Sequence, residues 1–184
     1  MFAVEGITIF IFSLFQKIKK IKFMINRLDK DSFNKAVNVR VDNRDCKWFK
    51  GFSTLTFAPE FVDKNTVKFL IEGLGMSVTK HRCDSRNCFL SAALGGKIET
   101  MKYLNSNFPE LKYQRDNWND TSLTSAAWVS NKETVQFLIE EMEINVTETG
   151  YEGRNCFLRA AEQCELETLK YLQGVKGTQG ETEL

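Results

Sequence analysis

Hydrophobic and polar positions recur along this chain with a period of 34 residues. One motif starts with a small polar residue, continues with a large apolar residue and ends in Ala; its copies are STLTFA from Ser53, NCFLSA from Asn87, TSLTSA from Thr121 and NCFLRA from Asn155. A second motif keeps the same frame; its copies are NTVKFL from Asn65, ETMKYL from Glu99, ETVQFL from Glu133 and ETLKYL from Glu167. Two motifs that hold one period through four copies predict an array of structural repeats.

The first motif predicts a helix with a defined start and end. Its first residue is Ser, Asn or Thr in every copy, and such side chains cap a helix by accepting a backbone N–H hydrogen bond. Leu or Phe follows two residues later as a core residue, and one or two Ala residues then allow neighbouring helices to approach closely. Gly96, or a small polar residue such as Ser130, is expected to end the helix.

The second motif predicts a second helix. It places Val67 and Leu70 three residues apart, so that both lie on one helical face, and the other copies repeat this spacing. One copy cannot bury its own apolar face, whereas four stacked copies can. The predicted fold class is therefore an all-α helix-turn-helix solenoid. Copies two and four also share Arg-Asn-Cys-Phe-Leu, from Arg86 and Arg154, which indicates duplication of a 68-residue pair.

A module of this kind resembles the ankyrin repeat, whose usual pattern is G-x-T-P-L-H-x-A-A followed by x-x-G-H-x-E-x-V-x-x-L-L. Residues 51–58 follow it at the Gly, the cap, the Leu and the Ala, and residues 92–101 follow its second part with Lys97 in place of His. The Thr-Pro-Leu-His core is replaced, and the period is 34 residues where the family favours 33. The resemblance covers about residues 48–174 and implies an ankyrin-type solenoid that binds proteins.

The repeat frame divides the chain into seven segments. We expect an apolar N-terminal segment (1–16), a degenerate N-terminal capping repeat (17–47), four repeats (48–81, 82–115, 116–149 and 150–174) and a flexible polar tail (175–184). The capping repeat is inferred from its lysine-rich surface positions, because end repeats need a polar outer face. The last residues, Thr182-Glu183-Leu184, resemble a ligand of PDZ domains, with a plain frayed terminus as the alternative.

The apolar stretch from Phe2 to Phe15 admits two interpretations. It is 14 residues long and contains Glu5, whereas a membrane-spanning helix needs about 20 apolar residues. Basic residues follow the stretch and do not precede it, which does not fit a cleaved secretory signal. We expect a capping or loosely ordered start. The alternative is a membrane-tethered protein anchored by residues 2–15, with the following lysines at the lipid headgroups.

Composition narrows the function classes. Lys and Arg number 25 against 24 Asp and Glu, so the net charge of +1 gives no basic coat for nucleic acid. The only histidine is His81, which excludes a multi-histidine metal site. The five cysteines form no CxxC pair and are odd in number, which favours free thiols in a reducing, cytoplasmic compartment. With no phosphate loop and no coherent pair of carboxylates, we expect no enzyme, no cofactor and no metal.

The resemblance implies that a protein partner binds the concave face formed by the finger loops and the first helices. The positions that vary between repeats of this type hold aromatic and charged side chains in this chain. The candidate binding residues are Arg86, Trp118, Asp120, Trp128, Tyr151, Glu152 and Arg154. Aromatic residues and Arg dominate the energetics of protein interfaces. We expect Trp118, Trp128, Tyr151 and Arg154 to form one contiguous patch on a monomeric adaptor or scaffold. The alternative is that the two tryptophans pack on each other as structure.

Overall fold

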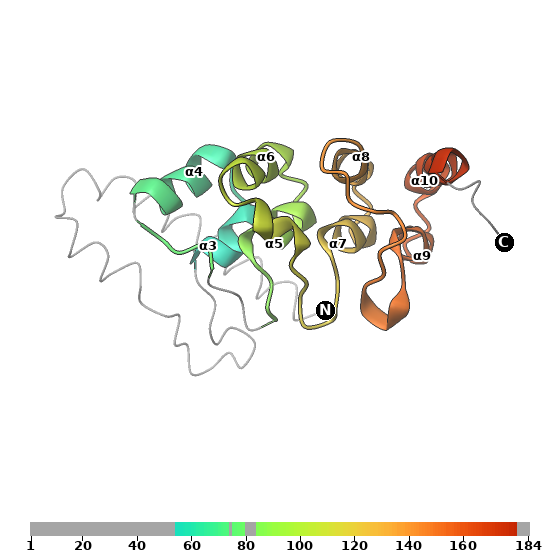
Figure 1. The fold of residues 1–184 in the computed structure, drawn as a ribbon, viewed down its shortest axis with the longest axis horizontal. Coiled ribbons are helices and arrows are strands. Elements are labelled where there is room, and N and C mark those ends of the chain that lie inside the picture. Colours follow the sequence, from blue (N-terminus) through green and yellow to red (C-terminus); the bar gives the residue numbers. More distant parts are fainter. Residues whose placement is uncertain (1–53, 74, 80–83, 180–184) are drawn as a thin grey trace, which may run out of the picture. The chain divides into compact units, whose positions relative to one another are not determined.

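The computed structural model describes residues 54–73, 75–79 and 84–179, all within one compact unit, Arg40–Leu184 (Figure 1). The N-terminal segment 1–16, the capping repeat 17–47, His81 and the terminal Thr182-Glu183-Leu184 lie outside the described residues, and the predictions for them stay predictions. The α-helices are α3 (Thr54–Phe57), α4 (Lys64–Lys68), α5 (Cys88–Leu94), α6 (Ile98–Asn107), α7 (Ser122–Trp128), α8 (Lys132–Glu140), α9 (Cys156–Glu162) and α10 (Leu166–Gln179). Shorter turns are η1 (Ala58–Glu60), η3 (Pro109–Tyr113) and η4 (Tyr151–Gly153), which are 3-10 helices, and η2 (Phe69–Gly73), a π-helix.

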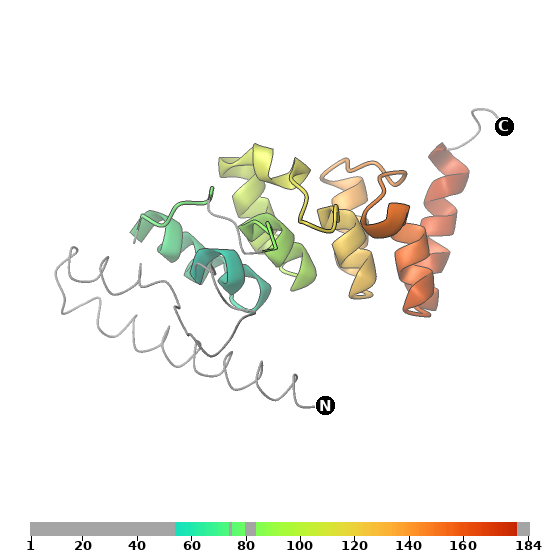
Figure 2. The same ribbon diagram turned by 90° about the horizontal axis from the view of Figure 1, so that it is seen from below.

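The helices form two layers. Figure 1 shows α3, α5, α7 and α9 in one row and α4, α6, α8 and α10 in the other, and Figure 2 shows the first row side by side. Within the first row, α5 contacts both α3 and α7, and α7 contacts α9. The described residues otherwise hold one isolated bridge, between Thr149 and Asn155. The predicted all-α helix-turn-helix solenoid is therefore confirmed.

The caps predicted from the first motif form wherever the structure describes them. In each case the side-chain oxygen of the cap accepts the backbone N–H of the residue three positions later. The three pairs are Asn87 with Leu90 at 2.8 Å, Thr121 with Thr124 at 3.2 Å and Asn155 with Leu158 at 3.0 Å. Each cap fixes where the first helix of its repeat begins, and so sets the position of every side chain that the helix carries.

The ends of the first helices also repeat. The backbone is left-handed at Gly96, Ser130 and Cys164, with φ of 65°, 57° and 56°, and these residues are spaced 34 apart. At each end an Ala carbonyl accepts the N–H of the residue five positions later; the acceptors are Ala92, Ala126 and Ala160. This pattern is the Schellman motif, which stops a helix and turns the chain toward the next one. The helix ends expected at Gly96 and Ser130 are confirmed.

The core lies between the two layers. The second helices, with the turn η2 after α4, contribute a buried stripe that repeats in register; its members are Val67, Leu70, Met101, Leu104, Val135, Leu138 and Leu172. The first helices contribute Leu55, Phe89, Leu90 and Leu123, all with no exposed surface. Burial of an aliphatic or aromatic side chain contributes about 1.5–3 kcal/mol. This core therefore explains why the two apolar motifs keep one period.

The C-terminal helix corrects one prediction. Residues 175–184 were expected to form a flexible tail, but α10 runs to Gln179. Gly174 and Gly177 each cost only about 1 kcal/mol inside a helix, and no proline interrupts the segment, so the helix continues past the last core residue, Leu172. Even with this extension, none of the helices among the described residues is long and apolar enough to cross a membrane.

Candidate functional site

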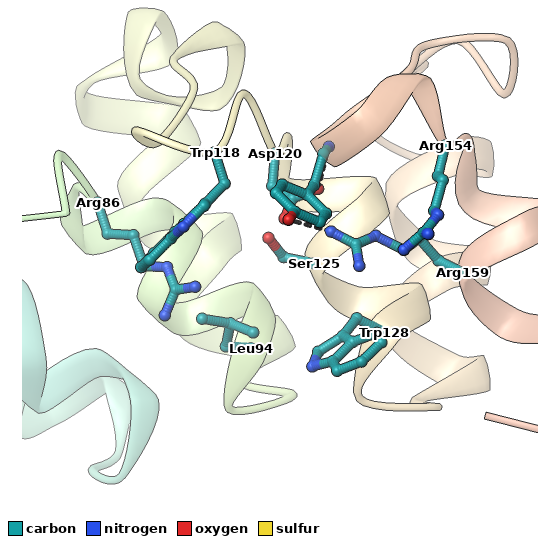
Figure 3. Close-up of a pocket in the computed structure, with 9 residues that line it drawn as sticks. Arg86, Leu94, Trp118, Asp120, Ser125, Trp128, Arg154 and Arg159 are labelled. Carbon is teal, nitrogen blue, oxygen red and sulfur yellow. Dashed lines mark hydrogen bonds and ion pairs between the residues drawn. The ribbon is translucent and has the colours of Figure 1, made fainter. Parts of the chain in front are cut away.

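An open pocket of about 320 Å³ lies where the loops before α7 and α9 meet the first helices (Figure 3). The lining residues are Arg86, Leu94, Trp118, Asp120, Ser125, Trp128, Tyr151, Arg154 and Arg159. The pocket brings together six of the seven candidate binding residues. The seventh, Glu152, joins it through Arg154, whose guanidinium lies 2.6 Å from the Glu152 carboxylate.

Tight loops place the aromatic side chains at the pocket. In the loop before α7, Asp116 Oδ1 accepts the backbone N–H of Trp118 at 3.0 Å and that of Asp120 at 2.9 Å. In the loop before α9, the N–H of Gly150 donates to the carbonyl of Arg154 at 2.8 Å. Glycine is required at 150, because a Cβ atom there would overlap the Asp120 carboxylate. The two loops are thus closed by their own backbone and packed against each other.

The aromatic rings carry guanidinium groups. The Arg86 guanidinium lies 5.1 Å from the Trp118 ring centre, and that of Arg159 lies 5.0 Å from Trp128 and 5.5 Å from Tyr151. The three aromatic residues keep 46%, 44% and 37% of their surface exposed, in the order Trp118, Trp128 and Tyr151. Figure 3 shows the two indoles on opposite sides of the pocket, each beside a different arginine. The alternative in which the tryptophans pack on each other is therefore wrong.

Asp120 and Arg159 form the buried base of the site. Arg159 Nη2 lies 2.6 Å from Asp120 Oδ2, and the two side chains are only 7% and 10% exposed, in that order. The other carboxylate oxygen of Asp120 accepts the Tyr151 N–H at 3.1 Å and the Thr124 hydroxyl at 3.0 Å. Asp120, one of the candidate binding residues, is therefore buried beneath the pocket. Its carboxylate joins α7, the next loop and α9, and so positions the rings above it.

Sequence reasoning missed Arg159. The same repeat position holds Ser91 and Ser125 in the preceding copies, and both serines are buried. Because this repeat position is normally part of the core, Arg159 was not included among the candidate binding residues. A signal was present, because residues 86–93 and 154–161 are identical except that Ser91 becomes Arg159. A charged residue at an otherwise buried small position requires a buried partner.

Carboxylates neutralise the other two arginines. Arg86 Nε donates to Asp116 Oδ2 at 3.1 Å. Arg154 pairs with Glu162 at 2.8 Å, besides its pair with Glu152. The pocket therefore presents apolar rings framed by paired charges and carries no strong charge of one sign. A hydrogen bond to Glu152 also raises the pKa of the Tyr151 hydroxyl, which stays protonated and able to donate at neutral pH.

Cys88 and Cys156, the two cysteines within the described helices, are not activated as thiolates. Burial raises the pKa of Cys88 to about 12 and that of Cys156 to about 11, so both are neutral at physiological pH. Cys164 is a free and exposed cysteine. Among the residues that the structure describes, no three His, Cys, Asp or Glu side chains lie together in a way that could hold a metal ion.

Comparison with known families identifies the repeats. A family model described as ankyrin repeats, in three copies, matches residues 55–149, which is just over half of the 184-residue chain. No curated protein matches the chain in a sequence comparison. The matched range begins in α3, includes α4 to α8 and ends just before η4. Ankyrin repeats are protein–protein interaction modules. The chain therefore belongs to the ankyrin-repeat family.

Proposed function

We propose that this protein is an adaptor or scaffold that binds a protein partner through the pocket between the repeat loops and the first helices. The contact residues are Arg86, Trp118, Trp128, Tyr151, Glu152 and Arg154. The observation that carries the proposal is the exposure of three large aromatic rings around one pocket, on a chain whose core is otherwise well buried. Exposed apolar clusters with a polar rim are typical of protein interaction sites.

Preorganisation supports the same function. Each ring is already fixed against a guanidinium, and each of these guanidinium groups is already paired with a carboxylate. Side chains that are ordered before binding lose less conformational entropy when a partner docks, and this entropy is a main cost of association. A purely structural cluster would bury its rings, whereas Trp118 and Trp128 keep nearly half of their surface open.

The charges indicate what the partner contributes. Because Arg86, Arg154 and Arg159 are all paired within the chain, the pocket gains little from a charged ligand. We infer that the partner inserts an uncharged apolar side chain between the indoles. Its affinity should then depend only weakly on salt, since salt screens exposed charges and not apolar contacts.

We further propose a cytoplasmic, monomeric protein without catalytic activity. The neutral, buried thiols of Cys88 and Cys156 and the exposed free thiol of Cys164 support a reducing compartment. Membrane tethering through residues 2–15 stays an alternative, because that segment lies outside the described residues.

Affinity capture with the full chain tests the proposed pocket. Trp118→Ala and Trp128→Ala should each weaken partner affinity by about 2 kcal/mol or more, the range of interface hot spots. Tyr113→Ala is the matched control, since Tyr113 is an exposed aromatic residue that does not line the pocket. Thermal melting should show little change for all three variants. Equal capture by wild type and both tryptophan variants would contradict the proposal.

A further inference from the structure

The aromatic pocket contains hydrogen-bond donors that the chain itself does not use. Trp118 and Trp128 each carry an indole N–H, a group that donates and cannot accept. Within the described part of the chain, neither indole N–H has a recorded partner. Figure 3 shows the indole nitrogen of Trp128 on the side of its ring that faces Leu94. Both N–H groups therefore need an acceptor from outside the chain.

Ser125 adds a third donor at the inner side of the pocket. Its side chain is almost fully buried, at 3% exposure, and Figure 3 shows its hydroxyl directed into the pocket. The equivalent Ser91 donates to the carbonyl of Thr56 at 2.6 Å, whereas no partner is recorded for the Ser125 hydroxyl among the described residues. Buried hydroxyl groups are normally hydrogen-bonded, so this one indicates a ligand that supplies the missing oxygen.

The acceptors at the pocket are already occupied. Asp120 is the only carboxylate among the residues that line the pocket in the described structure. Its Oδ2 pairs with Arg159, and its Oδ1 accepts the Tyr151 N–H and the Thr124 hydroxyl. Beneath the rings, Arg159 Nε is buried without a hydrogen-bond partner, which adds to the excess of donors. A fitting ligand thus brings acceptor oxygens and few N–H groups.

Proline-rich sequence meets both requirements. A proline residue has a carbonyl acceptor and no N–H, and its ring is apolar. Runs of proline form the polyproline II helix, which has no internal hydrogen bonds, so its carbonyl groups are free to accept. Such segments dock in aromatic-lined grooves, and because the helix is preformed they lose little conformational entropy on binding. Any other segment would bury backbone N–H groups that find no acceptor in this pocket.

We propose that the pocket binds a proline-rich segment of the partner protein in the polyproline II conformation. This inference rests on the proposed function and names the class of segment that the same pocket takes. Proline rings lie between the indoles of Trp118 and Trp128, and the carbonyl oxygens accept from the indole N–H groups and from the Ser125 hydroxyl. The absence of charge in such a segment agrees with the pairing of every arginine at the pocket.

The probe is capped, fluorescein-labelled decaproline, titrated with the full chain and followed by fluorescence anisotropy. We expect saturable binding that Trp118→Ala weakens about tenfold or more, as at an interface hot spot. Tyr113→Ala is the matched control and should leave binding unchanged, because Tyr113 is exposed and does not line the pocket.

Two further peptides separate the missing N–H groups from the proline ring. A peptide with alanine in place of alternate prolines restores backbone N–H groups and should bind about tenfold more weakly. A peptide with N-methylalanine at the same positions lacks both the N–H groups and the ring, and it should recover part of the affinity.

Two substitutions in the chain remove donors and keep the apolar walls of the pocket. Trp128→Phe retains an aromatic ring without an N–H, and Ser125→Ala removes the hydroxyl. Each should weaken decaproline binding about fivefold and leave the melting temperature of the chain nearly unchanged. In the wild type, the indole N–H proton resonance of Trp128, assigned through its absence in Trp128→Phe, should move downfield as decaproline is added.

The proposal is overturned if decaproline does not bind, or if the alanine-containing peptide binds as tightly as decaproline. Full-strength binding by both Trp128→Phe and Ser125→Ala would also overturn it, because the donors would then be unused. Partner capture that still depends on Trp118 and Trp128 would leave the proposed pocket standing after any of these results. Failure of this inference is therefore distinguishable from failure of the proposed function.

Discussion

Residues 86–93 and 154–161 differ only at one position, where Ser91 packs two helices together and Arg159 belongs to the pocket. In the first segment, the Ser91 hydroxyl donates to the carbonyl of Thr56 at 2.6 Å and ties two first helices together. In the second, Arg159 reaches Asp120 at 2.6 Å and lies beneath the Trp128 and Tyr151 rings. The repeat frame therefore fixes the backbone, and a single residue that faces the preceding repeat decides whether the position packs or organises a pocket.

The same comparison separates what a segment encodes from what its neighbours supply. The cap of Asn87 and that of Asn155 have nearly the same length, because a cap is local. The burial of Phe89 and the exposure of Phe157 differ, because burial depends on the next repeat. Paired substitutions at equivalent positions of α5 and α9 test this distinction.

The largest difference in the free energy of unfolding is expected when the same charge is introduced at equivalent positions of α5 and α9. Ala93→Asp puts a carboxylate without a partner in a fully buried position and should cost more than about 4 kcal/mol, enough to unfold the array. Ala161→Asp places the same carboxylate at an exposed position and should cost less than about 1 kcal/mol. Urea unfolding followed by circular dichroism measures both. Similar losses would mean that the α9 face is covered.

The next largest loss of stability is expected at Arg159, the residue that distinguishes segment 154–161 from segment 86–93. Arg159→Ser recreates the serine of the earlier copies, but it leaves Asp120 buried without its cation and should cost about 3–5 kcal/mol. Adding Asp120→Asn should recover part of the loss, because a neutral amide tolerates burial better than a carboxylate does. Arg154→Ser is the control, since its more exposed ion pairs should contribute no more than about 1 kcal/mol. A loss that the second substitution does not reduce would show that Arg159 acts through packing alone.

The fold could be predicted because its signals are local and repeated. The caps at Asn87 and Thr121 and the helix end at Gly96 each depend on residues within one turn, and the 34-residue period repeats them. The extension of α10 to Gln179 was missed because glycine weakens a helix without forbidding it, and glycine-rich sequence alone does not distinguish the two cases.

The site could be predicted only in part. Trp118, Trp128 and Tyr151 stand out by residue type at loop and helix-end positions, and the structure brings them to one pocket. The pair of Asp120 with Arg159 joins residues 39 apart in sequence, and it forms only because the loop before α9 is stacked on α7. Aspartate in a loop is usually exposed, so its burial here follows from a tertiary contact that residue type does not reveal.

A smaller difference is expected at the two asparagine caps. Asn87→Ala removes the cap and also the bonds to Leu111 and Gln114, and should cost about 2–3 kcal/mol in total. Asn155→Ala removes the cap and should cost about 1 kcal/mol. Thermal or urea unfolding of the two variants gives the comparison directly. Equal costs would show that the bonds from Asn87 to the following segment contribute nothing.

The smallest difference lies in the chemistry of the two equivalent cysteines. Burial raises the pKa of Cys88 to about 12 and that of Cys156 to about 11, and Cys156 lies in α9, the helix whose Phe157 and Leu158 are exposed. Alkylation proceeds through the thiolate, so Cys156 should react with iodoacetamide faster than Cys88 at pH values well below both pKa values. Both rates should rise about tenfold per pH unit between pH 7 and 9, since the thiolate fraction grows as protons leave.

Peptide mapping by mass spectrometry measures these rates in the intact chain, with the exposed Cys164 as an internal reference that reacts first. The direction of the expected difference follows from the equilibrium alone. The folded protein favours the neutral thiol at both positions and favours it more strongly at Cys88, where the whole helix face is covered. Faster reaction at Cys88 than at Cys156 would mean that the stack opens more readily around α5 than around α9, which would reverse the comparison drawn from burial.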